Sequence, residues 1–299
     1  MSFESLTPRL KSGRPIVVDA DTCASFRARG VAVDSPGAVG ELLRKSPGVV
    51  LEHYVAEVQS DVNVLCALTA DTTPRALAEV GMQHRSAALT ARAVEIAQEA
   101  RERSPRPIAI AGVLGSEMVA PMFAERLREE LEEHADRIKT AGVELIFARG
   151  QGSRIELMTA VSAAAAAEVP VWAVVECSAG GELAVGGTLP PLLDSLREAG
   201  ASAVLFEVSS IDDGLAALAR ASALAEAEAF AIGVLLASSR DSVRGFPDPE
   251  SDAERWAARA LEFDSADARI IGGGADTTEA HTAALVTELR AVHPSIRPR

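Results

Sequence analysis

Charged side chains follow several short apolar runs of this sequence. Asp19 ends the first run and Asp21 comes shortly after it, Arg149 follows the fourth run, Glu176 follows the fifth and Glu207 ends the sixth. Carboxylates that converge on one place raise one another's pKa or bind a hard cation, and an arginine among them can hold an anionic ligand. These residues predict a polar site. We take Glu207, Glu176 and Arg149 as candidate catalytic groups and the two aspartates as candidate substrate contacts.

A run of three glycines follows the last apolar segment, at Gly272, Gly273 and Gly274. A glycine-rich turn that leads into a helix can hold phosphate, and α/β barrels often bind phosphate beside their last two strands. A turn that needs only backbone freedom carries the same glycines, and a short glycine run is a weak motif. We expect the run to border the substrate site for backbone reasons. A phosphate-binding barrel enzyme is the weaker alternative.

Three cysteines, Cys23, Cys66 and Cys177, lie near the ends of the first, second and fifth apolar runs. Three thiolates and a carboxylate would bind zinc tetrahedrally, but strands so far apart around a barrel would strain that geometry. A free cysteine is commonly a small buried hydrophobe. We therefore favour buried thiols over a zinc site and predict no cofactor. An odd and small number of cysteines also fits a reducing cytoplasm.

The elements that must position these residues alternate along the chain. Eight short runs are apolar at consecutive positions, as parallel strands covered on both faces are. Each is followed by a segment with helical spacing, for example Ala87–Arg103 or Arg154–Glu168. The runs are Ile16–Asp19, Val62–Leu68, Ile108–Gly112, Glu144–Ala148, Val171–Val175, Ala203–Glu207, Ala231–Leu236 and Ala268–Gly272.

Eight strand–helix units predict a single (β/α)8 TIM barrel domain over residues 1–299, with functional groups at the carboxyl ends of its strands. The alternative is an open doubly wound sheet, which usually has a glycine-rich turn after its first strand. Here that turn reads Ala20-Asp21-Thr22-Cys23, without a glycine, so we prefer the barrel.

The composition limits the classes of partner that the protein is expected to bind. Apolar residues make up 48% of the chain and charged residues 24%, which is ordinary for a globular protein in water. The net charge of −14 should repel phosphate backbones, so we expect no nucleic acid partner. The apolar runs are too short to span a bilayer, and the first residues lack the apolar core of a signal peptide. We expect a cytoplasmic protein with no membrane partner.

Five segments carry a family resemblance. The most specific is the last, which is similar to the motif ARIIGGCC. The segments are Val17-Val18-Asp19-Ala20-Asp21-Thr22, His53-Tyr54-Val55-Ala56, Ile110-Ala111-Gly112-Val113-Leu114-Gly115, Ala141-Gly142-Val143-Glu144-Leu145-Ile146 and Ala268-Arg269-Ile270-Ile271-Gly272-Gly273-Gly274-Ala275. Along almost its whole length the chain thus resembles the homocysteine S-methyltransferases. The resemblance implies a barrel in which zinc, held by three thiolates, activates the homocysteine sulfur.

The resemblance breaks at the metal ligands. The three positions of the family thiolates are occupied by Val208, Gly274 and Ala275, and Arg149 stands where the family has a glutamate of its amino-acid pocket. In the first motif only Asp19 is retained cleanly. The resemblance therefore implies the scaffold without the zinc–thiolate site.

Two function classes follow from this. We expect a protein of methionine or one-carbon metabolism that binds an amino-acid or one-carbon ligand and acts as a binding subunit, or as the partner of another methyltransferase or reductase polypeptide. The alternative is an enzyme with non-zinc chemistry, either methyl transfer or acid–base catalysis, at the acidic barrel mouth with Arg149. If active, it would be a methyltransferase-like transferase and not a conventional zinc-dependent one.

Overall fold

The structure of the chain is a computed structural model. The structure describes residues 6, 9, 13–115, 124–150, 153–228, 230–238 and 249–294, and only the backbone of residues 124, 222–228 and 249–251. In this part of the chain, no helix is both long and apolar enough to cross a membrane.

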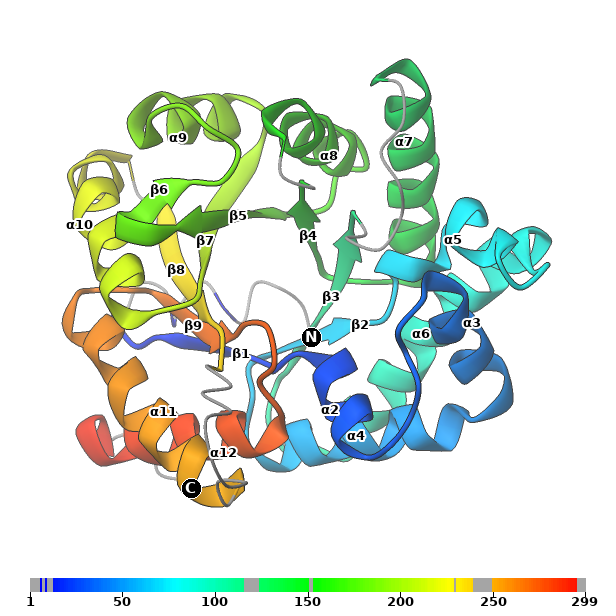
Figure 1. The fold of residues 1–299 in the computed structure, drawn as a ribbon, viewed down its shortest axis with the longest axis horizontal. Coiled ribbons are helices and arrows are strands. Elements are labelled where there is room, and N and C mark those ends of the chain that lie inside the picture. The colour runs from blue at the N-terminus through cyan, green and yellow to red at the C-terminus, as the bar shows by residue number, and fades with distance from the viewer. Residues whose placement is uncertain are drawn as a thin grey trace.

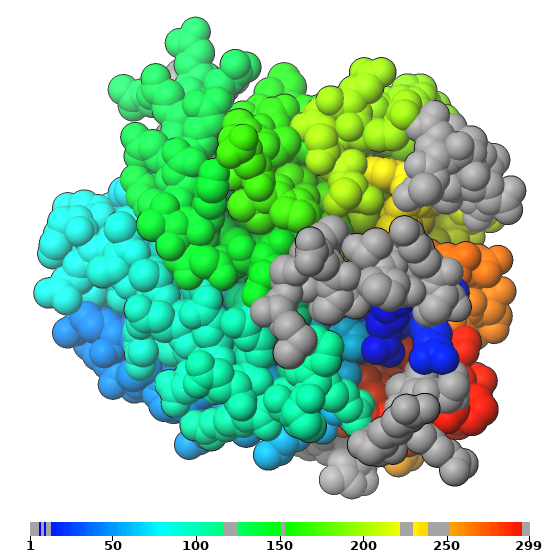
Figure 2. Space-filling model, turned by 180° about the vertical axis from the view of Figure 1, so that it is seen from behind, coloured from blue at the N-terminus to red at the C-terminus, as the bar shows by residue number. Residues whose placement is uncertain are grey.

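Eight parallel strands form a closed barrel (Figure 1). Ile16 of the first strand pairs with Ile270 of the last, which closes the cylinder. Seen from behind, the first described residues accordingly lie against the last helices (Figure 2). The predicted (β/α)8 barrel is confirmed. Its strands are β1 (Ile16–Val18), β2 (Val64–Ala67), β3 (Ala109–Leu114), β4 (Leu145–Arg149), β5 (Val171–Ser178), β7 (Ala201–Val208), β8 (Ala231–Leu236) and β9 (Ile270–Gly273).

A ring of helices surrounds the barrel, and the eight predicted helical segments are all present. They are α4 (Pro47–Gln59), α6 (Ser86–Arg101), α7 (Ala124–Ala141), α8 (Arg154–Ala166), α9 (Leu189–Glu198), α10 (Ile211–Glu228), α11 (Pro249–Ser265) and α12 (Glu279–Val292). Short elements that we did not predict are α2 (Thr22–Ala28), α3 (Pro36–Lys45), α5 (Pro74–Ala78) and β6 (Glu182–Leu183), which pairs antiparallel with the end of β5.

Side chains alternate along each strand between the barrel interior and the layer under the helices. On β5, Trp172 and Val174 belong to the interior cluster, where Trp172 stacks on Phe147 of β4 with ring centres 5.4 Å apart. Val175 and Cys177 belong to the outer cluster instead. Because the period is two residues, this alternation decides which strand-end residues point into the barrel mouth.

Candidate ligand site at the barrel mouth

A cavity of about 270 Å³ opens at the carboxyl ends of the barrel strands. This volume is just below the range of about 300–1,000 Å³ that is typical of ligand cavities, so the cavity has the size for a small metabolite. Its apolar wall includes Val18, Val113, Phe147, Val174 and Leu235. Its polar lining includes Asp19, Asp21, Cys23, Arg27, Cys66, Asp71, Arg149 and Glu207.

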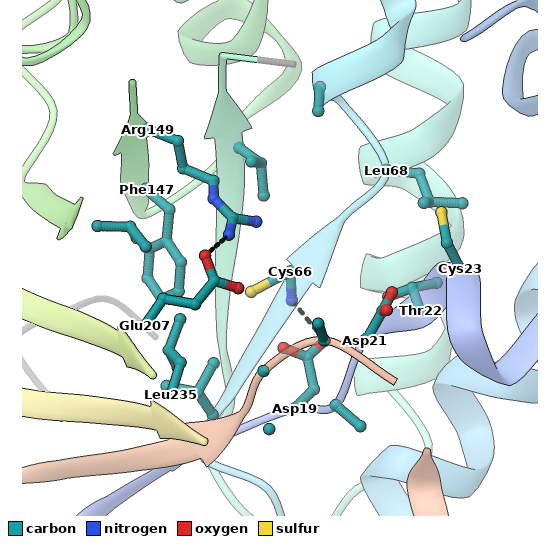
Figure 3. A pocket seen from close by; sticks show the side chains of 18 of the residues that line it. Asp19, Asp21, Thr22, Cys23, Cys66, Leu68, Phe147, Arg149, Glu207 and Leu235 are labelled. Atoms are coloured by element: carbon teal, nitrogen blue, oxygen red, sulfur yellow. Dashed lines mark hydrogen bonds and ion pairs between the residues drawn. The ribbon is translucent and has the colours of Figure 1, made fainter. Parts of the chain in front are cut away.

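The predicted catalytic trio is only partly assembled. Arg149 and Glu207 both line the cavity, and Arg149 Nη2 donates a hydrogen bond to Glu207 Oε2 (Figure 3). The side chains are 26% and 20% exposed, so both charges face the cavity while partly shielded from bulk water. Glu176 is exposed and is not among the lining residues. The arrangement offers a ligand one cationic group and one anionic group side by side.

Asp19 is buried in the wall of the same cavity, with 2% of its surface exposed. Its Oδ2 accepts a hydrogen bond from the Cys66 backbone N–H at 2.7 Å (Figure 3). Its Oδ1 has no hydrogen-bond partner among the described residues. Burial raises the pKa of Asp19 to about 7, against hydrogen bonds from Cys66 that lower it. Asp19 can therefore change its protonation state near neutral pH.

Asp21, the other predicted substrate contact, also lines the cavity but has structural partners. Its Oδ1 caps α2 by accepting from the Ala24 N–H at 3.1 Å, and its Oδ2 accepts from the Asp276 N–H at 3.2 Å. It also forms an ion pair with Arg27 at 3.4 Å. These contacts give Asp21 a structural role, so a ligand is not needed to account for an aspartate at this position.

The predicted glycine turn packs tightly against its neighbours. A Cβ on Gly272 would lie 2.7 Å from Val18 Cβ, and one on Gly273 would lie 2.3 Å from Thr277 Oγ1. Gly273 and Gly274 line the cavity, but the Gly274 N–H already donates to the Leu236 carbonyl at 2.8 Å. Backbone packing among the described residues therefore accounts for the glycines.

The three cysteines do not converge. Cys23 and Cys66 line the cavity, whereas Cys177 is buried in the outer cluster, where burial raises the pKa of its thiol to about 12. Burial and the neighbouring Asp19 carboxyl also raise the pKa of the Cys66 thiol well above its ordinary value. Within the described ranges, no three His, Cys, Asp or Glu side chains are arranged to hold a metal. The relocated three-cysteine site is therefore not assembled.

The three positions that the resemblance assigns to the family thiolates are not all directed into the cavity. Val208 is buried in the outer cluster, so the side chain at the end of β7 that enters the cavity is Glu207. A Cβ on Gly274 would lie 2.9 Å from the Ala237 amide nitrogen and 3.0 Å from the Leu236 carbonyl carbon. Of the three positions, Gly274 and Ala275 line the cavity and Val208 does not.

Sequence reasoning missed Glu57, which is fully buried behind the cavity. The signal was present, since Glu57 lies seven residues after Val50 on the apolar face of α4 that also holds Tyr54 and Val58. His53 of the same helix is also buried, and its ring centre lies 5.5 Å from that of Phe26 and 5.4 Å from that of Tyr54.

The closed barrel defines a (β/α)8 protein with a cavity at its mouth. The family model of homocysteine S-methyltransferase matches residues 17–289, and the chain belongs to this family. No curated protein sequence matches the chain.

Solved structures agree on the fold. The metallated form of the homocysteine methyltransferase MmuM from Escherichia coli has a TM-score of 0.79 at 19% identity, covering 95% of this chain and 99% of that one. Its oxidized form has a TM-score of 0.75 at 19% identity, covering 92% and 96%. The 3-dehydroquinate dehydratase of Geobacillus kaustophilus has a TM-score of 0.54 at 12% identity, covering 95% and 93%. At these identities the likeness concerns the fold alone.

Proposed function

We propose that this family member lacks the zinc–thiolate site, binds an amino-acid-sized or one-carbon metabolite in the barrel mouth, and serves as a binding or partner subunit in methyl-transfer metabolism. The observation that carries this proposal is the pair of family positions that cannot present a thiolate. Val208 faces the outer core, and the space beside Gly274 is filled by the backbone of β8 and the residue after it.

The cavity itself supports ligand binding. Arg149 can hold a carboxylate, Glu207 can accept from an ammonium group, and the apolar wall can cover an aliphatic chain. A zwitterion with a short apolar side chain matches this combination. Such a ligand would replace part of the Arg149–Glu207 contact with its own charged groups.

The test is calorimetry and thermal-shift measurement with homocysteine, methionine and a folate, each with and without zinc. We expect an amino-acid ligand to raise the melting temperature without zinc, and Arg149→Met to abolish the effect. Elemental analysis of protein purified with zinc present should find no stoichiometric metal. One tightly bound zinc per chain, or stabilisation only when thiol and zinc are both present, would refute the proposal.

The second candidate is an enzyme with acid–base chemistry, favoured by the unpartnered Asp19 Oδ1 in the cavity wall. In this version Glu207 and Arg149 position the substrate and Asp19 transfers a proton. Once a turnover is found, Glu207→Gln and Arg149→Met should each reduce it. Glu176→Gln serves as the control, because Glu176 is exposed and outside the cavity lining. Unchanged turnover in the first two variants would remove these residues from the mechanism.

A further inference from the structure

A second buried carboxyl lies directly behind the cavity wall. Glu57 of α4 is 0% exposed, and its Oε1 accepts a hydrogen bond at 3.2 Å from the backbone N–H of Ala20, the residue that follows Asp19. Its Oε2 has no hydrogen-bond partner in the described part of the chain. Both carboxyls therefore lie at the end of β1, where Asp19 lines the cavity and Glu57 reaches in from α4.

Neither carboxyl has a cationic partner. Among the described residues, no lysine or arginine forms an ion pair with Asp19 or Glu57, while the nearby Glu279 carboxylate is paired with Arg29. Arg149 and Arg27 line the same cavity as Asp19, but they form ion pairs with Glu207 and Asp21. The remaining titratable groups around the pair are neither lysines nor arginines. They are Asp21 after β1, Cys23 of α2, Cys66 of β2, Tyr54 and His53 of α4, and Glu279 of α12, whose Oε2 lies 3.6 Å from His53 Nδ1.

Ionising two buried carboxyls that have no cationic partner costs free energy, because each carboxylate loses its hydration and the two negative charges repel each other. Burial raises the pKa of Glu57 to about 7, with His53 lowering it and Asp19 raising it. Burial also raises the pKa of Asp19 to about 7, and the nearby Asp21 carboxyl contributes to this rise. The unpartnered oxygen on each residue is where a proton can reside.

We propose that Asp19 and Glu57 share one proton at neutral pH, that Asp19 exchanges this proton with the bound ligand, and that Glu57 is the positioning residue that keeps it available. The exchange with a ligand rests on the proposed function. The shared proton rests only on the two buried carboxyls and can be tested without any ligand.

The experiment is a titration of the ligand-free protein, with the side-chain carboxyl carbons of Asp and Glu labelled with carbon-13 and followed by NMR. Asp19→Asn identifies the Asp19 signal by its loss. We expect Asp19 to titrate near neutral pH, and Glu57→Gln to lower its midpoint by about one pH unit, because the repelling charge is gone. Glu52→Gln is the matched control, since Glu52 is exposed on the same helix.

Two results would overturn the proposal. One is an Asp19 midpoint near the ordinary value of about 4 in the unmodified protein. The other is an unchanged Asp19 midpoint in folded Glu57→Gln. If that variant does not fold, Asp19→Asn gives the reciprocal measurement, in which the Glu57 midpoint must fall. An Asp19 midpoint near neutral pH that falls in Glu57→Gln, together with no binding of homocysteine or methionine, would count against the proposed function and leave the shared proton standing.

Discussion

Arg149 at the end of β4 is joined to Glu207 at the end of β7, across the intervening strand β5. Arg149 is in register with Val174 of β5, whereas Glu207 is in register with Glu176, two residues further along. The ion pair therefore leans over the apolar side chain of Val174, which lines the same cavity. The register of three strands places opposite charges on one wall of the mouth.

Removing one member of this pair should cost stability as well as ligand binding. Arg149→Met leaves the Glu207 carboxylate partly buried and unpaired, which we expect to cost about 1–3 kcal/mol in urea unfolding at neutral pH. Arg149→Met/Glu207→Gln should recover part of that loss. Arg154→Met is the control, because Arg154 bonds Ser195 away from the cavity. A double variant less stable than the sum of both single losses would contradict this reading.

The buried acid pair should make the fold less stable at alkaline pH. The pKa values of Asp19 and Glu57 are raised to about 7 in the folded state, above their ordinary values. Their stabilising contribution is complete below those ordinary values and is lost as pH rises through about 7. We expect Glu57→Gln to flatten this decline by on the order of 3 kcal/mol, measured by urea unfolding at several pH values. A slope as steep as that of Glu52→Gln would argue against it.

The buried His134 should make the fold less stable at acid pH. It is fully buried on α7, its Nε2 lies 2.8 Å from the Thr69 carbonyl oxygen, and burial lowers its pKa to about 4. Its contribution is present above the unfolded value of about 6.5 and is lost as pH falls toward about 4. His134→Gln, which keeps a donor without titrating, should reduce the acid destabilisation seen in urea unfolding. Exposed His84→Gln should change nothing, and equal acid sensitivity of the two variants would refute the assignment.

Putting cysteines back at the family positions should not create a zinc site. Val208→Cys would place its sulfur in the outer core, and Gly274→Cys would push a Cβ against the backbone at Ala237. Gly274→Ala alone should cost about 1–3 kcal/mol through overpacking. Gly48→Ala is the control, since a Cβ there meets nothing within 4 Å.

Elemental analysis and thermal unfolding check this prediction. We expect the variant with all three cysteines to unfold at a lower temperature and to retain no zinc after dialysis. A folded triple variant with one zinc per chain would show that the backbone can move to admit the thiolates.

The sequence was sufficient for the barrel and the family. Eight consecutive apolar runs separated by segments of helical spacing leave few alternatives to a closed parallel sheet. The motifs from Val17 to the end of the glycine run indicated the family correctly. It was less sufficient between β1 and β2, where α3 lies, and between β2 and β3, where the five-residue α5 lies. Pro36 and Pro74 begin these helices, and short elements show too little periodicity to predict.

Only the tertiary structure decided which strand-end residues form the site. The runs are apolar at consecutive positions and do not alternate between apolar and polar residues. The sequence therefore could not tell that Glu207 faces the mouth while Val208 and Cys177 face the helices. A one-residue step turns a side chain to the opposite face, and the register between strands then sets its partner. The placement of Glu57 behind Asp19 likewise depends on the docking of α4 on β1, which no local pattern specifies.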